Sequence, residues 1–496
     1  MIISGKIKIA KLSYQQEIEL MLEHATLDYQ DTSQYATNAF LLGLISFAQR
    51  IGCLPALGLV HVPMKTVIHS VPEKIQTLLL SYTIACRSSH AINTQLGCDP
   101  LVAQCLGIAY FADDSAFSRF YQRIDPEAVE DLVSVRQMLY EGHGLARHMH
   151  GLIIVDLDST GLIVKGNQFE RADAGYFAKH RGEIGYQLNL ACASNAGKEV
   201  LAHILDPGHV NPGARFWDLL YQVGEALGFL DERLFIRADR LYGVGAYVSH
   251  LIELEIGFLL KGRDSRTARR WVNELEPTLA WIQVDPTCWV VDIGQRHMPN
   301  CPYLVRVILI RTLDQKSQTY HYSYLVTSLP ATECSEVDLF HFYNERVTLE
   351  KLIERCKNVW HISHLPTHSF EGLLFYFELR FLAYNLLLWY QHYVLAPDER
   401  LAAMKVFELV TTLAPVSIVA HQQPPADLVL YLANAPHLVQ ALLTLTQAWL
   451  RQVAQAGWVW LGDLCRLTYD WSQFINDIWH ATPRPDCWLR AGSCKT

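Results

Sequence analysis

The sequence has little charge and lacks several familiar local motifs. Only 18% of its 496 residues are charged and 50% are apolar, so it can bury a large core and is not a disordered chain. Its 12 cysteines form no C-x-x-C pair, which argues against a zinc knuckle, and their scatter is typical of a reducing cytoplasm. The motif G-x-x-x-x-G-K is absent, so no phosphate loop of that kind is predicted.

No segment has the pattern of an export signal or a membrane span. The first twenty residues, MIISGKIKIAKLSYQQEIEL, are too mixed for a signal peptide. The most apolar stretch, Leu373 to Leu395, contains Glu378 and Arg380, which favours a buried helix over a membrane span. We therefore predict a cytoplasmic protein without a membrane partner.

The net charge of −9 argues weakly against a nucleic-acid partner, because phosphate contacts need Lys and Arg. A local basic segment can still carry such contacts. One segment, residues 261–270, combines a single acid with five cations, which are Lys261, Arg263, Arg266, Arg269 and Arg270. It is typical of a track along a DNA backbone, and a solvated basic loop is the alternative.

Both ends of the chain have helical patterns, and the length predicts two to four domains. Residues 1–150 form a predicted helical region that could bind DNA ends. Within it, two short patterns between Pro100 and Ile124 resemble a helix-turn-helix, with Arg119 on the second helix, and a plain helical bundle fits equally well. Residues 397–496 are predicted as a second helical region, with a loop at Gln422–Pro425.

The middle of the chain alternates between strand and helix patterns. We predict strands at 152–155, 186–193, 199–205, 234–236 and 256–260 and a helix at 216–227, which together indicate an α/β sheet. This core would comprise 151–270 and 331–396. Residues 271–330 interrupt it with a β-rich insertion, whose strands are predicted at 289–293, 304–310 and 321–327.

Three acids lie at positions where an α/β sheet gathers ligands. Asp156 and Asp158 end the first predicted strand, and Asp239 follows the fourth. The carboxyl ends of such strands form ligand sites. Each acid taken alone fits a strand end reaching solvent equally well.

The segment FYNERVTLEKLIERCKN, residues 342–358, is predicted to be one helix. On it, Tyr343, Arg346, Glu350 and Lys357 fall on a single face at about 100° per residue. Glu354 lies on the same face and is a rival to Glu350. A solvated face with ion pairs is the alternative.

The order Y-x2-R-x3-E-x6-K resembles the signature of a large branch of bacterial insertion-sequence transposases with a ribonuclease H-like core. Tyr343, Arg346, Glu350 and Lys357 match it, and Asp158 stands in a matching D-x-T setting. Asp239 matches the second acid of the family, and the β-rich insertion lies where the family commonly has one. The resemblance covers roughly 150–395 and implies a DDE transposase with helical regions flanking an α/β catalytic core.

The resemblance assigns Asp158, Asp239 and Glu350 as catalytic acids and ligands of two magnesium or manganese ions. It favours Asp158 over Asp156. Hard divalent ions prefer carboxylate oxygens, and two of them about 4 Å apart can activate a nucleophile and neutralise the phosphate. Tyr343, Arg346 and Lys357 would contact DNA beside the cleaved bond.

The implied partner is double-stranded DNA, comprising transposon ends and target, bound by a homodimer at the nucleoid. Some family members stack a flipped base on a tryptophan of the insertion, for which Trp271, Trp281 and Trp289 are the candidates. The histidines at 143–150 and 361–368 are predicted to be polar surface or loop residues. A nuclease without strand transfer and a non-catalytic DNA-binding derivative remain alternatives.

Overall fold

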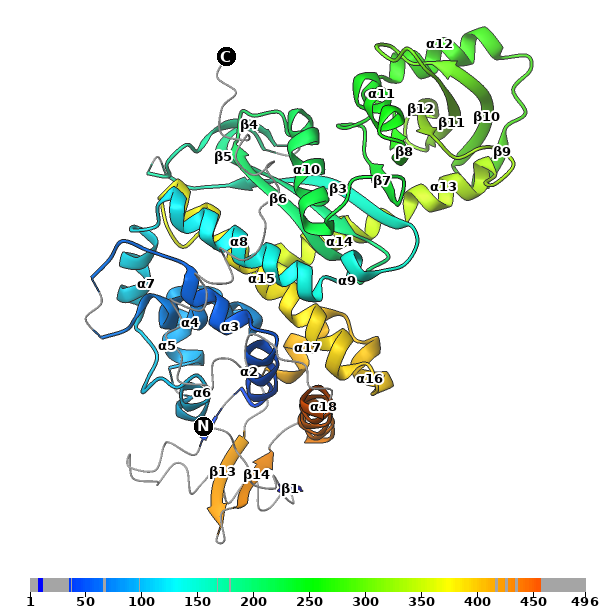
Figure 1. Cartoon of the computed structure of the whole chain (residues 1–496). Helices are drawn as coiled ribbons and strands as arrows, with labels where there is room; N and C mark the ends of the chain where they lie inside the picture. The colour runs from blue at the N-terminus through cyan, green and yellow to red at the C-terminus, as the bar shows by residue number, and fades with distance from the viewer. Residues whose placement is uncertain are drawn as a thin grey trace.

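The computed structural model describes residues 8–11, 35–36, 38–65, 68–97, 99–166, 168–177, 180–414, 418–423, 427–432 and 436–455. Its centre is one large twisted sheet with helices packed against it (Figure 1). Five strands of the core coincide, to within a residue at some starts, with the five strands predicted from sequence, and the predicted helix is present. These elements are β3 (Ile153–Ile163), β5 (His180–Ala193), β6 (Glu199–Pro207), α10 (Phe216–Leu227), β7 (Leu234–Ala238) and β8 (Gly257–Lys261).

The order of these strands confirms the predicted fold class. They lie side by side as β6, β5, β3, β7 and β8. β3 is antiparallel to β5, and β5 to β6, whereas β3, β7 and β8 run parallel to one another. Three antiparallel strands followed by two parallel strands, each reached through a helix, form a ribonuclease H-like core. Three further elements complete it, namely β4 (Asp173–Phe177), η3 (Pro212–Arg215) and α11 (Gly245–Glu253).

The β-rich insertion continues the core sheet. Its strand β12 pairs antiparallel with β8, with Val326 opposite Leu260, and β11, β10 and β9 follow outward. Figure 1 shows these strands at the upper right, beyond β7 and β8. The insertion is therefore joined to the core by main-chain hydrogen bonds. Its elements are α12 (Ser265–Leu275), β9 (Ile282–Asp285), β10 (Cys288–His297), β11 (Leu304–Asp314) and β12 (Thr319–Thr327).

The helices before and after the core share one hydrophobic core with it, which extends from Ala39 to Leu443. The N-terminal helices are α2 (Phe40–Arg50), α3 (Cys53–Ala56), η2 (Leu57–Leu59), α4 (Val71–Thr83), α5 (Ser89–Gln95), α6 (Pro100–Cys105), α7 (Asp114–Tyr121), α8 (Pro126–His143) and α9 (Leu145–His148). The later helices are α13 (Glu336–Asn344), α14 (Val347–Asn358), α15 (Phe370–Tyr390), η4 (Gln391–Leu395), α16 (Glu399–Ala403), α17 (Val406–Leu413) and α18 (Pro436–Gln455). The domain limits proposed from sequence stay predictions.

Helix α15 is the buried helix predicted in the most apolar stretch. Nearly all of its residues from Phe370 to Tyr390 are buried. Its Glu378 pairs with Arg136 of α8, and Arg136 also donates to the carbonyl of Leu201 on β6 at 3.1 Å. Burial lowers the pKa of the neighbouring His203 to about 4, so that imidazole is neutral at pH 7. Arg136 is therefore the cation that balances Glu378, and it ties the N-terminal helices to the sheet.

A second, smaller sheet corrects the prediction of purely helical flanks. It joins β1 (Lys8–Lys11), β14 (Asp427–Leu432), β13 (Ile418–Gln423) and β2 (Tyr35–Ala36) in that order. Gln422, placed in a loop from sequence, is paired with Leu428. These strands are too short to be identified from the alternation of apolar and polar residues. Their pairing could not be predicted either, because β1 and β14 are far apart in the sequence.

The pattern between Pro100 and Ile124 forms the short helices α6 and α7. Helix α7 is capped by Asp113, whose Oδ1 accepts from the amide of Ala116 at 2.8 Å. Its Phe117 and Phe120 are fully buried in the shared core. This burial favours the helical bundle over a projecting helix-turn-helix.

No single helix in the described ranges has both the length and the apolar composition needed to cross a membrane. One bent pair, Phe40–Arg50 with Cys53–Leu59, meets those two criteria only when its helices are counted together.

The buried pair between α8 and α15 yields a stability prediction. Glu378→Gln is expected to lower the free energy of unfolding by about 3–5 kcal/mol, because it leaves Arg136 buried without its counter-charge. Urea titration followed by circular dichroism measures this. The matched control is Glu371→Gln on the same helix, where Glu371 and Arg171 have side chains 23% and 61% exposed, and the expected loss is at most about 1 kcal/mol. Equal losses in both variants would contradict the role given to Arg136.

Candidate active site

The parallel pairing of β3 and β7 places two of the predicted acids side by side. Leu157 lies opposite Ala238, the last residue of β7. Asp158 and Asp239 each follow by one residue, so they are neighbours at the carboxyl edge of the sheet. Asp239 Oδ1 accepts from the amide of Leu241 at 2.8 Å, which holds its side chain at the start of the next loop.

The loop after Asp239 is fixed by two residues that the sequence analysis did not single out. Tyr242 is fully buried, and its hydroxyl donates to Asn189 Oδ1 on β5 at 3.2 Å. Gly243 passes so close to β8 that an added Cβ would lie 1.8 Å from the carbonyl oxygen of Lys261. These two contacts fix residues 240–245, RLYGVG, and so hold Asp239 in position at the start of the loop.

The predicted signature helix is two helices, which corrects the sequence interpretation. α13 ends at Asn344 and α14 begins at Val347. At the joint, the amide of Arg346 donates to Tyr343 rather than to Phe342, at 3.1 Å. The carbonyl oxygen of Phe342 accepts a hydrogen bond from Nη1 of Arg237 on β7 instead, at 2.7 Å. A tertiary hydrogen bond thus replaces a helical one, and periodicity alone could not reveal it.

The tightened joint still presents Arg346 to the acids. Its Nη1 lies 3.3 Å from Asp158 Oδ2, and its Nη2 donates to Glu350 Oε1 at 2.6 Å. Asp239 is also near enough to raise the pKa of the guanidinium. Three acids from separate segments therefore converge on one buried cation. Tyr343 lies behind it, with its ring centre 5.7 Å from the guanidinium carbon.

The electrostatics at Asp158 are those of a crowded acidic site. Burial raises the pKa of Asp158 to about 6, Arg346 opposes the rise, and Asp239 and Glu350 add to it. Glu350 is half exposed, at 49%, and Asp158 is 13% exposed. Extra positive charge would relieve the repulsion among these carboxylates.

The donor set fits hard divalent ions in its chemistry. Asp158, Asp239 and Glu350 offer the carboxylate oxygens that magnesium and manganese prefer. Within the described residues, no group of three metal-ligating side chains is close enough to hold an ion as it stands. The guanidinium of Arg346 lies between the acids as a stand-in cation, so metal entry requires it to move aside.

Asp156 has a different position from Asp158. Its side chain is fully buried, and Arg237 donates to both of its oxygens, Nε at 2.7 Å and Nη2 at 2.9 Å. Ser194 also donates to it. The same arginine contacts Glu345 at 3.2 Å at the joint of α13 and α14. Asp156 is therefore engaged in the protein interior by Arg237, whereas Asp158 faces the guanidinium of Arg346.

Lys357 lies further along α14 and contacts β3. Its amine donates to Thr160 Oγ1 at 2.5 Å and to the carbonyl of Gly161 at 2.9 Å. Thr160 is the threonine of the D-x-T match, so the two motifs meet in space. Burial lowers the pKa of this amine. In this conformation Lys357 links α14 to the strand that carries Asp158.

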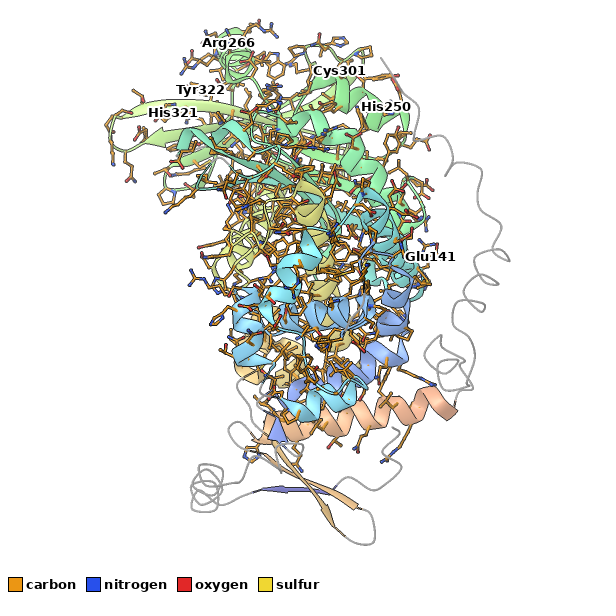
Figure 2. The ribbon with its side chains drawn as sticks, turned by 90° about the vertical axis from the view of Figure 1, so that its left-hand side faces the viewer. Glu141, His250, Arg266, Cys301, His321 and Tyr322 are labelled. Carbon is orange, nitrogen blue, oxygen red and sulfur yellow. The ribbon has the colours of Figure 1, made fainter. Side chains whose placement is uncertain are left out.

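The basic segment 261–270 is split between the end of β8 and helix α12, so the alternative of one solvated loop is wrong, and its role as a track along DNA stays a prediction. Lys261, at the end of β8, lies near Asp239, Arg240 and Arg346, and burial followed by the two arginines lowers its pKa. The other cations are exposed; Arg266, Arg269 and Arg270 lie on α12, and Figure 2 shows Arg266 at the outer end of the molecule. Arg240, missed from sequence, adds a cation directly after Asp239.

The remaining candidates are one acid and three tryptophans. Glu354 is exposed on α14. Trp271 of α12 is buried against Tyr324 of β12, with ring centres 5.0 Å apart, so it belongs to the core. Trp281 and Trp289 flank Arg311, with ring centres 4.6 and 4.9 Å from its guanidinium carbon.

The histidines divide between surface and interior. His148 and His150 are partly exposed, and His364 lies near the surface beside Arg87. His143 is buried, and its Nε2 lies 3.2 Å from the carbonyl of Ile51, so the prediction of a polar surface residue is wrong there. Helix α8 turns it into the core.

The comparisons with known proteins concern most of the chain. The family model described as Transposase DDE domain group 1 matches residues 58–453. A search of curated proteins gives no match. Among solved structures, the chain is similar to piggyBac transposase in a synaptic complex with hairpin DNA, with 11% identity and a TM-score of 0.43, covering 91% of this chain and 87% of that one.

Substitution of the two nearby acids of β3, Asp156 and Asp158, is expected to have unequal effects on stability. In buffer with a metal chelator, Asp156→Asn is expected to lower the free energy of unfolding by about 3–5 kcal/mol, because it leaves Arg237 buried without its counter-charge. Asp158→Asn is the matched control and is expected to cost little or nothing, because burial and two neighbouring acids already oppose its charge. Chemical denaturation of both variants measures the difference. A larger loss for Asp158→Asn would reverse the two assignments.

Proposed function

Because this chain belongs to the DDE transposase family, in the group matched above, we propose that it cuts DNA at the ends of a mobile element and joins them to a target. Asp158, Asp239 and Glu350 are the proposed catalytic acids and metal ligands. The observation that carries the proposal is their convergence on Arg346. These acids come from β3, from the residue after β7 and from α14, and chain proximity does not explain their meeting.

Two divalent ions bound by these acids would supply an activated water or 3′ hydroxyl and neutralise charge on the reacting phosphate. The protein itself holds the acids in place. Asp158 is fixed by the pairing of β3 with β7, Asp239 by its loop, and Glu350 by the joint that Arg237 secures. Rigid strands and a secured helix are suited to keeping in-line geometry.

DNA backbone contacts are proposed for the cations beside the acids. Arg346 offers a planar guanidinium that can bind a phosphate through two hydrogen bonds once it leaves the carboxylates. Lys261 and Arg240 lie near Asp239 and would extend the path. Tyr343 supports Arg346 through its ring, and Lys357 keeps α14 on β3. Arg263, Arg266, Arg269 and Arg270 would contact DNA further from the cleaved bond.

Action on two element ends and a target favours a homodimer on double-stranded DNA. The assignment to the insertion-sequence branch with the Y-R-E-K signature, and the choice of magnesium or manganese, stay predictions. The branch assignment is supported by the contacts of Tyr343 and Glu350 with Arg346 and by the contact of Lys357 with Thr160 of the D-x-T match.

Removal of the carboxylate of Asp239 or of Glu350 tests whether these acids take part in catalysis. Asp239→Ala or Glu350→Ala is expected to slow magnesium-dependent cleavage on the order of a thousandfold or more, because metal ions supply several kcal/mol of transition-state stabilisation. The assay uses duplexes carrying the sequences that flank the coding region, with gel readout of nicking and of joined product. Glu354→Ala is the matched control on the same helix and should retain activity. Wild-type rates in Asp239→Ala would contradict the triad, and nicking by the native protein without joining would indicate a nuclease.

The role of Arg346 is tested by binding. Arg346→Ala is expected to weaken binding to end-containing duplexes and to reduce the slope of log K against log salt by about 1, as expected for one lost phosphate contact. Fluorescence anisotropy at several salt concentrations measures both quantities. Arg233→Ala is a control, because its guanidinium stacks on Phe229, 3.4 Å from the ring centre, and pairs with Asp231. An unchanged slope in Arg346→Ala would refute the contact.

A further inference from the structure

Arg380 is a buried cation that the proposed catalytic site does not use. It lies in the middle of α15 and is only 1% exposed. Aromatic rings surround it, with the ring centres of Tyr82, Tyr376 and Trp360 at 4.4, 5.3 and 6.0 Å from the guanidinium carbon. Rings offer a partial negative face, but they do not replace a hydrogen-bond acceptor.

The guanidinium lacks the acceptors that its donors need. Nη1 reaches the carbonyl of Cys86 at 3.5 Å, whereas Nε and Nη2 are buried with no hydrogen-bond partner among the described residues. Two other buried arginines differ in this respect, because Arg136 and Arg237 each pair with a buried carboxylate. A buried charge without a partner is costly, and such groups require an explanation.

No nearby side chain in the described structure supplies the missing negative charge. Glu378, two residues earlier on α15, is engaged by Arg136. Burial raises the pKa of the Cys86 thiol to about 12 and holds the pKa of Tyr82 well above its usual range, so both groups are neutral at pH 7. At the surface above the site, Arg87 donates to His364 Nε2. These surroundings are neutral or basic.

A cavity lies beside the guanidinium between α4, α7 and α15. Its volume is about 20 Å³, and its lining includes Arg380, Tyr82, Tyr121, Ser88 and Ser89. That volume holds a particle about the size of a water molecule, since roughly 10–15 Å³ suffices for one. The hydroxyls of Tyr82 and Tyr121 hydrogen-bond to each other. Because one hydroxyl donates in that bond, the other keeps its proton for a further acceptor.

We propose that this cavity binds one small monatomic anion of the halide class, chloride being the common one, through Arg380 Nε and Nη2. Ring edges and the free tyrosine hydroxyl proton would complete its surroundings. The anion would neutralise Arg380 and stabilise the packing of the N-terminal helices on α15. The cavity is lined by residues of α4, α7 and α15, whereas the three acids are carried by β3, the loop after β7 and α14, which separates this site from the DNA contacts proposed above.

The test measures the melting temperature of the full-length protein in sodium chloride, bromide, fluoride and gluconate, with the total ionic strength held constant as the halide concentration is varied. Chloride and bromide are expected to raise the melting temperature by about 2 °C for each tenfold increase above half-saturation. In Arg380→Met the melting temperature should no longer depend on the halide concentration. The control is Arg136→Met, which removes an arginine that pairs with a carboxylate; its melting temperature should be lower throughout but should still rise with halide. An equal rise in gluconate, or a rise retained by Arg380→Met, would overturn the proposal.

Crystals of the wild-type protein grown in bromide provide a second measurement that does not depend on any variant folding. An anomalous bromide peak within hydrogen-bonding distance of Arg380 Nε and Nη2 is the expected result. Electron density at that position without an anomalous signal, as a water molecule would give, would overturn the proposal of an anion site.

Discussion

The buried ion pair between Asp156 and Arg237 is the constraint on which the rest of the site depends. It joins β3 to β7 at the register that brings Asp158 beside Asp239. The same guanidinium takes the carbonyl of Phe342, which ends α13 and redirects the chain into α14. One cation therefore sets the positions of all three proposed catalytic acids without being one of the groups that would meet the substrate. Such a pair is valuable for the geometry it enforces more than for net stability.

Much of the fold was predictable because the core strands are apolar runs of ordinary length. Their order in the sheet follows from the pattern of three strands, helix, strand, helix and strand. The acids could be chosen because Glu350 has Tyr343, Arg346 and Lys357 at fixed spacing. The β-rich insertion was also recognised, but its pairing with β8 was not, since a pattern of alternation identifies a strand and not its neighbour.

The errors arose where tertiary contacts override local pattern. The break at Glu345–Arg346 depends on Arg237, more than a hundred residues earlier, and the second sheet depends on strands from opposite ends of the chain. The basic segment was a run of charges in sequence, yet it divides between the end of β8, where Lys261 lies near Asp239, and helix α12, which begins at Ser265 and carries Arg266, Arg269 and Arg270. Asp156 and Asp158 share a strand face; the resemblance favoured Asp158, and the position of Arg237 shows that Asp156 is engaged in the interior.

The separation of the three acids along the chain has a consequence for synthesis on the ribosome. When Asp158 and Asp239 have emerged, the strand β12 that extends the sheet and the helix that carries Glu350 have not yet been made. A nascent or prematurely terminated chain thus has an incomplete set of acids. If the proposed function holds, cutting of nucleic acid would wait until α14 has been made and has docked on β3 through Lys357. The order of segments in the gene would then delay a hazardous activity until most of the chain is complete.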